Sequence, residues 1–455
     1  MLHLHLRTAS KICRLDRNVI HYIHKKQLIR ESHVGLPWNR PRASRVASLL
    51  RLRTARRRSV AMAVNEKRRS NAPVGMGLVG PGFIAAHHID AVRRLGNVDV
   101  VAIAGSSLRS TQQKAREWHV ERAYGDYLEL IGDPNVDVVH NTTPNHLHFA
   151  VSMAALRAGK HVVSDKPLAM DAQQCRELCI AAAKARVAHV VTFNYRGNPL
   201  VQHARTMVAN GDTGAIRFVH GHYLQDWLAD ETVWSWRMDP AKGGASAALL
   251  DIGSHWCDLA EHVTGSRIQS VLADLTTVVP TRRRPARGGK SARVAVTSED
   301  LASVLLRFDN GARGCFSVGQ VLPGHRNDVR LEVNGRNASL RWLQERQNEL
   351  WIGRHAQPEQ LLHKDPAQLA GDALRYARLP AGHQEAWSDA FFNLIADAYR
   401  WIADGGAANK KPAPLPTFDD GWRSARLIEA MLRSHAAGGA WTQPAEPIAR
   451  GERKP

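Results

Sequence analysis

The chain has 455 residues, and its 62 Lys and Arg outnumber its 42 Asp and Glu, which gives a formal net charge of +20. Hydrophobic residues make up 44% of the chain, enough at this length for a large core in one or two domains. No apolar run reaches the ~18 residues of a membrane helix. The five cysteines are an odd number without Cys-x-x-Cys spacing, which argues against a disulfide framework and a zinc ribbon. We therefore expect a cytoplasmic protein without a membrane partner.

The positive charge is concentrated at the start of the chain. Residues 1–70 hold 18 Lys and Arg against three acids and net +15, whereas the rest of the chain nets +5. We expect residues 1–72 to form a disordered basic leader. Its composition fits a nucleic-acid-binding arm, a mitochondrial-type targeting peptide, or translation from an upstream start ahead of Met62. The last interpretation is favoured because the first recognisable strand follows directly, and we expect no nucleic-acid partner.

From residue 73 onward, short apolar strands alternate with helices. Strands are expected at residues 74–79, 98–104, 136–140, 161–164 and 188–193, with helices at 87–95, between 110 and 118, at 146–158 and at 172–185. This alternation is typical of right-handed βαβ units around a parallel sheet. It predicts a doubly wound α/β domain over residues 73–196.

After residue 196 the pattern becomes mixed. Helices are expected at 200–210, 248–262, 385–403 and 422–434, and strands at 216–223, 270–278, 302–308, 314–321, 330–334 and 338–342. Asn310-Gly311 is a hairpin turn signal, and residues 281–293 are expected to form a basic loop. Residues 197–440 therefore predict a second α/β domain with a mainly antiparallel sheet, followed by a tail at 441–455.

A glycine-rich turn, Gly80-x-Gly82-x-x-Ala85, follows the first strand and opens the first helix. Gly80 makes the tight turn, Gly82 lets the backbone approach a pyrophosphate, and Ala85 lets helix and strand pack closely. The helix N-terminus adds free N–H groups and a partial positive charge. The motif predicts a Rossmann domain. Its predicted dinucleotide contacts are Gly80, Gly82, Phe83 and Ile84.

The stretch after the second strand bears on the choice of cofactor. Dinucleotide folds usually place an acid there to hold the adenosine ribose hydroxyls. Residues 105–109 (Gly-Ser-Ser-Leu-Arg) contain no carboxylate, and Ser106 and Arg109 suit a 2′-phosphate better than a bare hydroxyl. We expect both residues to contact the cofactor, with NADP(H) favoured over NAD(H).

Four further motifs follow in order along the chain. They are Thr-Thr-Pro-Asn-His-Leu-His at 142–148, Ser-Asp-Lys-Pro at 164–167, Phe-Asn-Tyr-Arg at 193–196, and Gly243-Gly244 leading to Asp-Ile-Gly-Ser-His-Trp-Cys-Asp at 251–258. In this order and spacing the set resembles the Gfo/Idh/MocA oxidoreductases over about residues 73–435. The resemblance implies a Rossmann domain and an α/β domain with an open, mainly antiparallel sheet. It also implies hydride transfer between NAD(P) and a sugar, cyclitol or related polyol, in a homo-dimer or homo-tetramer.

The resemblance assigns Lys166, Asp251 and His255 as the catalytic group. Lys166 follows a strand at its carboxyl end, where ligands of doubly wound sheets bind. Asp251 and His255 are four residues apart and would share one face of the expected helix. We expect His255, whose side chain ordinarily titrates nearest neutrality, to act as acid or base on the reacting hydroxyl. Lys166 would polarise the oxygen and Asp251 would orient the substrate or the lysine; which of Lys166 and His255 carries the proton stays open.

The matching motifs imply further contacts. Expected cofactor contacts are Thr143, Asn145, His148, Asp165 and Lys166, where Asp165 is one methylene shorter than the glutamate of the family. The resemblance also implies a cis Lys166–Pro167 bond. Expected substrate contacts are Tyr195, Arg196, Trp236, Arg237 and His255, although Trp residues in this stretch also suit a loop anchor or a subunit contact. No Cys and His cluster has metal-ligand spacing, so no metal is expected.

Two other functions fit the same fold. One is an enzyme with a tightly held cofactor that oxidises one sugar and reduces another. The other is a cofactor-bound regulatory protein without catalysis, because a fold by itself does not establish an activity. The intact set of Lys166, Asp251 and His255 argues against the regulatory protein.

Overall fold

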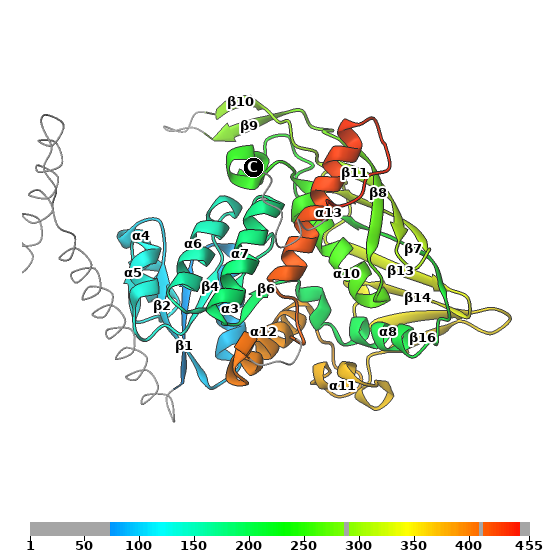
Figure 1. Ribbon diagram of the computed structural model, residues 1–455, viewed down its shortest axis with the longest axis horizontal. Coiled ribbons are helices and arrows are strands. Elements are labelled where there is room, and N and C mark those ends of the chain that lie inside the picture. The colour runs from blue at the N-terminus through cyan, green and yellow to red at the C-terminus, as the bar shows by residue number, and fades with distance from the viewer. Residues whose placement is uncertain (1–72, 286–290, 409–412, 446–455) are drawn as a thin grey trace, which may run out of the picture. The chain divides into compact units, whose positions relative to one another are not determined.

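Two large sheets organise the chain from Pro73 onward, and both belong to one unit (Figure 1). The structure is a computed structural model that describes residues 73–285, 291–408 and 413–445. The predicted leader at 1–72, the centre of the predicted loop at 281–293 and most of the tail at 441–455 lie outside the described residues. None of the helices in the described ranges is both long and apolar enough to cross a membrane.

The first sheet is built by the alternating strands and helices of the N-terminal half. Its six parallel strands lie in the order β3-β2-β1-β4-β5-β6. Their bounds are β1 Val74–Val79, β2 Val98–Ala104, β3 Arg122–Tyr124, β4 Val138–Asn141, β5 His161–Ser164 and β6 His189–Val191. The strand order reverses between β1 and β4, and doubly wound sheets bind ligands at the carboxyl ends of the strands flanking such a point. The predicted parallel Rossmann sheet is confirmed.

Helices cover both faces of this sheet. They are α3 Phe83–Arg93, α4 Leu108–Glu117, α5 Tyr127–Gly132, α6 Asn145–Arg157, α7 Ala172–Ala185 and, from the end of the chain, α12 Trp387–Ala403. One apolar core packs α3 and α12 against the strands, and another packs α5, α6 and α7. Neither β3 nor α5 was expected, because a strand of three residues and a helix of six are too short to show a periodic pattern.

The second sheet has eight strands in the order β16-β15-β14-β13-β7-β12-β11-β8. They are β7 Ile216–Leu224, β8 Ile268–Thr276, β11 Leu301–Phe308, β12 Arg313–Gly319, β13 Asp328–Gly335, β14 Ala338–Leu343, β15 Glu349–Arg354 and β16 Gln360–His363. Only β7 and β12 pair in parallel among these neighbours. The helices α8 Pro199–Ala209, α10 Ser254–Thr264 and α13 Phe418–Ala436 cover one face (Figure 1). The predicted second domain with a mainly antiparallel sheet is thus confirmed.

Two further differences from the sequence prediction lie close to the site. Within and just after the predicted loop at 281–293, the described residues pair as two antiparallel strands, β9 Thr281–Pro285 and β10 Ser291–Ala295, which we call the β9–β10 hairpin. The sequence shows no alternation of apolar and polar residues in β9, because its buried side chain is a charged one, Arg282. The predicted helix at 248–262 begins as a π-helical turn, η3 Leu249–Gly253, and only then continues as α10. Asp251 and His255 therefore do not have the simple α-helical spacing that was expected.

Candidate active site

A cavity of about 1530 Å³ opens at the carboxyl ends of the parallel strands and extends to the second sheet. Most of the predicted site residues line it. They are Gly80, Gly82, Phe83, Ile84, Ser106, Thr143, Asn145, Asp165, Lys166, Tyr195, Trp236, Arg237, Asp251 and His255. Motifs between residues 80 and 196 and those between residues 236 and 255 therefore line the same cavity.

The glycine-rich turn forms one end of the cavity. Gly80 has φ +92°, and a Cβ there would lie 2.7 Å from the backbone nitrogen of Thr143. Gly82 instead faces open space, because a Cβ built there would meet no atom closer than 4.0 Å. No side chain caps the N-terminus of α3, so its N–H groups are available to an anion. These features fit the pyrophosphate of a dinucleotide.

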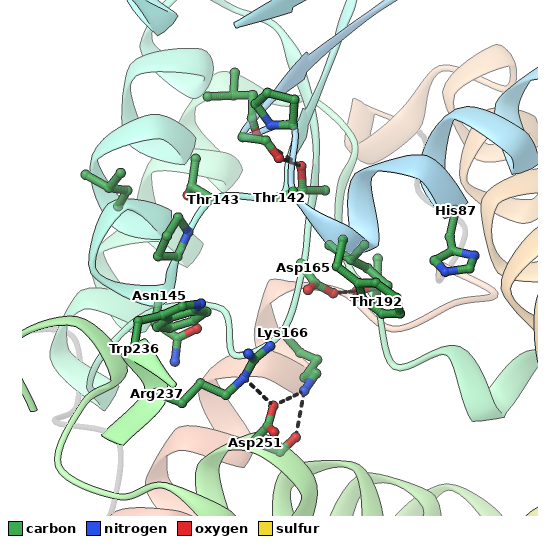
Figure 2. A pocket seen from close by; sticks show the side chains of 18 of the residues that line it. His87, Thr142, Thr143, Asn145, Asp165, Lys166, Thr192, Trp236, Arg237 and Asp251 are labelled. Carbon is green, nitrogen blue, oxygen red and sulfur yellow. Dashed lines mark hydrogen bonds and ion pairs between the residues drawn. The ribbon is translucent and has the colours of Figure 1, made fainter. Parts of the chain in front are cut away.

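Asp251 lies at the opposite end, at the centre of a cluster of donors. Lys166 Nζ donates to both its backbone oxygen and its Oδ1, each at 2.7 Å, while Arg237 Nε donates to Oδ1 at 3.2 Å. Figure 2 shows these three side chains converging. Gln320 Nε2 donates to Oδ2 at 2.8 Å. Burial alone would raise the pKa of Asp251, but the charges of Lys166 and Arg237 hold it well below its usual range, so the carboxylate stays ionised.

His255 lines the cavity next to this cluster and is only 7% exposed. Its ring contacts Phe193 and Tyr195 edge-on, with centroids 5.7 and 5.1 Å away. Burial, and then the positive charge of Lys166, place the pKa of His255 well below its ordinary value. The imidazole is therefore neutral at pH 7, the state that can accept a proton.

The remaining predicted cofactor contacts are tied into the loops around Lys166. Thr192 Oγ1 donates to Asp165 Oδ1 at 2.5 Å, and the Lys166–Pro167 bond is cis, as expected. Asn145 Nδ2 donates to Gly243 O at 2.8 Å, which links the motif at 142–148 to the second domain.

His148 does not line the cavity. Its two ring nitrogens contact the carbonyl oxygens of Pro167 and Thr143 at 2.6 and 2.7 Å. The side chain thus holds together two loops that do line the cavity, and a contact between His148 and the cofactor stays a prediction.

Two predicted arginines also lie elsewhere. Arg196 Nε donates to Asp258 Oδ2 at 2.9 Å and its Nη2 to Asp420 Oδ1 at 2.8 Å, and it does not line the cavity. It joins three segments, and its charge is already neutralised by these carboxylates, so its contact with a substrate stays a prediction. Arg109 is exposed on α4 and does not line the cavity. The residues of this region that do line it are Ser106, Ser110 and Lys114.

A polar network that the sequence did not indicate surrounds the substrate end. Tyr223 Oη donates to Asn327 Oδ1 at 2.7 Å and lies 2.9 Å from Tyr195 Oη. Gln225 Nε2 also donates to Asn327 Oδ1, at 3.0 Å, and Gln225 Oε1 accepts from Gln320 Nε2 at 3.3 Å. Of these residues only Tyr195 was predicted, because the others carry no local motif and come from separate strands and loops. The network connects through Gln320 to Asp251.

Among the described residues, no group of three or more His, Cys, Asp and Glu is arranged to hold a metal ion. Lys166 and Arg237 pair with Asp251, which also accepts from the amide of Gln320. The expectation that no metal takes part stays a prediction.

Comparison with known proteins gives a family for this geometry. Residues 74–193 match the oxidoreductase family with an NAD-binding Rossmann fold, and residues 201–341 match the GFO/IDH/MocA C-terminal domain. A levoglucosan dehydrogenase from Pseudarthrobacter phenanthrenivorans is 30% identical over 396 residues, which cover 81% of this chain and 97% of that protein.

Solved structures are similar over the same range. Levoglucosan dehydrogenase in complex with NADH and levoglucosan aligns with a TM-score of 0.75 at 28% identity, covering 82% of this chain and 100% of the other. An inositol dehydrogenase homolog complexed with NAD+, from Azotobacter vinelandii, aligns with a TM-score of 0.74 at 28% identity, covering 82% and 98%. The chain therefore belongs to the Gfo/Idh/MocA oxidoreductases, an NAD-binding family, as its motifs predicted.

Proposed function

We propose that this protein is an NAD(P)-dependent dehydrogenase or reductase that transfers a hydride between the nicotinamide and a carbinol carbon of a sugar, anhydrosugar or cyclitol. The observation that carries the proposal is the Lys166–Asp251 pair, which lies in one cavity with a turn suited to a dinucleotide. The relatives support the substrate class by name: a levoglucosan dehydrogenase, a 1,5-anhydro-D-fructose reductase from Ensifer adhaerens and an inositol dehydrogenase homolog.

In this proposal Lys166 binds the reacting oxygen. Its ammonium group has three N–H donors, and two of them point at Asp251. The third is available to the oxygen of a hydroxyl or a carbonyl, whose polarisation favours hydride transfer at the adjacent carbon. Asp251 orients the lysine and remains an anion throughout, because its pKa is held low.

His255 moves the proton. As a neutral base, it accepts the hydroxyl proton when the polyol is oxidised and returns it when the ketone is reduced. The nicotinamide, when bound, supplies or receives the hydride. The aromatic face of Trp236 and the guanidinium of Arg237, stacked 4.6 Å apart, provide an apolar surface and a donor for the rest of the ring.

A substrate panel tests the proposal. The purified enzyme is mixed with sugars, anhydrosugars and inositols in the presence of NAD+ or NADP+, and the nicotinamide absorbance is followed. We expect turnover of at least one ring polyol. Tight cofactor binding without turnover of any member would contradict the proposal and favour a non-catalytic cofactor-binding protein.

We also propose that NADP(H) is preferred over NAD(H). The end of β2 carries no carboxylate, and Ser106, Ser110 and Lys114 line the cavity there, with Arg109 beside them on α4. Ser106→Asp would place an acid against a 2′-phosphate, which costs several kcal/mol when like charges meet. We expect this variant to lose kcat/KM for NADP+ and not for NAD+. A strong preference of the unaltered enzyme for NAD+ would contradict the proposal.

We further propose that the protein is a homo-oligomer assembled through the open face of the eight-stranded sheet. The helices cover the other face, whereas Leu305 and Phe218 on this one are 48% and 38% exposed. Light scattering should give a dimer or a tetramer, and a monomer at micromolar concentration would contradict the proposal.

A cytoplasmic location is supported by the free thiols of Cys175, Cys179, Cys257 and Cys315.

A further inference from the structure

A small lobe stands at the substrate end of the cavity and has its own apolar core. The core contains Leu228, Met238, Val296 and Val321, with Val233, Trp234 and Val279 packed against it. These residues come from the segment 225–239, from the base of the β9–β10 hairpin and, for Val321, from just after β12. We call this segment the tryptophan loop, because it carries Trp227, Trp234 and Trp236.

The tryptophan loop has no regular structure to hold its backbone. No helix or strand occurs between residues 225 and 235, so its carbonyl groups lack the partners that a sheet or helix would provide. Both ends of the loop reach the cavity: Trp227 lines it at one end, and Trp236 and Arg237 at the other. The position of this loop therefore sets what the substrate meets.

A few backbone hydrogen bonds hold the loop, such as Arg283 N to Glu231 O at 3.3 Å, and Arg282 supplies further side-chain donors. This side chain of β9 is 1% exposed, and its Nη2 donates to Leu228 O at 2.7 Å. Its Nη1 donates to Asp230 O at 3.0 Å and to Val233 O at 3.4 Å. One buried guanidinium thus holds three carbonyl groups of the loop.

A second residue keeps this charge in place. Asp300 Oδ2 lies 3.8 Å from Arg282 Nη2, and the Asp300 carboxylate accepts from Val278 N at 2.7 Å and from Val279 N at 3.0 Å. A buried charge is costly unless it is paired and hydrogen-bonded. Arg282 is paired with Asp300 and donates from Nη1 and Nη2, while its buried Nε has no partner in the structure. The hairpin, the loop and the start of β11 are therefore joined at one guanidinium.

The tryptophan loop contacts the cluster around Asp251 directly. Arg237, at its end, donates to Asp251 Oδ1, which also binds Lys166. Arg284, on the same strand of the hairpin as Arg282, stacks over Trp234 at 5.4 Å and lies 3.8 Å from Asp239 Oδ2. This second contact is weaker because Arg284 is 46% exposed.

We infer that Arg282 is a positioning residue for substrate recognition, which acts by holding the tryptophan loop so that Trp227, Trp236 and Arg237 face the polyol. It touches neither substrate nor cofactor. This inference rests on the proposed function, and it predicts that loss of Arg282 affects the polyol and not the dinucleotide.

Three arginines of one hairpin test this. Arg282→Met keeps the length of the side chain and removes its donors, while Arg282→Lys keeps a charge and some donors. Arg283→Met is the matched control, because Arg283 is the exposed neighbour on the same strand. We expect Arg282→Met to raise KM for the polyol about 10-fold or more with a smaller change in kcat, Arg282→Lys to restore part of the loss, and Arg283→Met to change nothing.

Two measurements are independent of turnover. The cofactor Kd, from nicotinamide fluorescence, should stay within about twofold of the unaltered enzyme because the sites are far apart. Amide hydrogen exchange of residues 228–237 should speed up in Arg282→Met and not in Arg283→Met. If Arg282→Met fails to fold, Arg284→Met, at the half-exposed contact, should raise KM by a smaller factor.

An unchanged KM together with unchanged exchange would overturn the inference. An equal loss of cofactor and polyol binding would also overturn it, because it would indicate general destabilisation. If the unaltered enzyme binds the cofactor but turns over no polyol, the proposed function fails, and the exchange result still decides whether Arg282 orders the loop.

Discussion

The two ends of the active-site cavity are built from different parts of the polypeptide. The dinucleotide end is made mainly of backbone: the turn at Gly80, the open side of Gly82 and the uncapped N-terminus of α3. The substrate end is made of side chains, with Asp251 held by donors from Lys166 and two other segments.

This difference predicts two kinds of sensitivity. A site made of backbone depends on φ and ψ and on the space in front of it, so a change is felt as altered conformation and weaker cofactor binding. A site made of side chains depends on individual hydrogen bonds, and a buried charge that loses one is destabilised at once. Substitutions at the two ends should therefore separate cofactor binding from turnover.

The largest effect is expected at Lys166. Lys166→Met removes the group that polarises the reacting oxygen and leaves Asp251 with fewer donors. We expect kcat to fall by about 10²- to 10³-fold, the range for loss of a donor that stabilises the reacting oxygen, with the cofactor Kd little changed. Lys184→Met, at an exposed position on α7, is the control. Full turnover by the Lys166 variant would refute the assignment.

Gln320 should give the next largest effect. Gln320→Met keeps the volume of a buried side chain but cannot donate to Asp251 Oδ2. A hydrogen bond to a charged group contributes about 1.5–3 kcal/mol, so kcat/KM should fall at least ~10-fold. Steady-state kinetics on the preferred polyol measure this, with exposed Gln269→Met as the control. Equal losses in both variants would argue against a role for Gln320 in holding Asp251.

The two glycines test the backbone end. Gly80→Ala would force a side chain into a left-handed conformation and against the backbone of Thr143, so we expect a lower Tm and a cost of about 1–2 kcal/mol or more. Gly82→Ala should leave Tm unchanged, because its Cβ meets open space, and should weaken cofactor binding by crowding the pyrophosphate. Thermal melts with and without cofactor separate the two. Identical behaviour of both variants would contradict the backbone interpretation.

A smaller effect is expected from buried histidines behind the dinucleotide end. His88 Nδ1 lies 2.8 Å from His140 Nδ1, and burial lowers the pKa of His88 to about 4. The His88 side chain therefore stays unprotonated in the folded state at a pH below about 6.5, where it binds a proton in the unfolded chain.

The unfolding free energy should therefore fall on acidification, by about 1 kcal/mol for His88 between pH 6.5 and 5.5. Urea unfolding at the two pH values measures this difference. His88→Phe should reduce it, and a stability that rises on acidification in this window would contradict the assignment.

The sequence predicted much of the dinucleotide domain because its signals are local. The bounds expected for β1, β2, β5 and α7 agree with the structure residue by residue. The ion pairs of Arg196 were not predicted, for the opposite reason. Arg196 has a motif neighbour in Tyr195, but its partners Asp258 and Asp420 lie 62 and 224 residues away. No local pattern reveals a pairing over such a separation.

By itself, the sequence determined the family, the two α/β domains, the glycine-rich turn and the trio Lys166, Asp251 and His255, because periodicity and short motifs encode them along the chain. Only the tertiary structure decided which charged side chains form ion pairs within the protein and which line the cavity. It paired Arg196 with Asp258 and Asp420, placed both ring nitrogens of His148 against carbonyl groups, and brought Gln320 to Asp251 and Arg282 to the tryptophan loop. The physical reason is that the state of a buried polar group depends on its partners, and folding chooses these from distant segments.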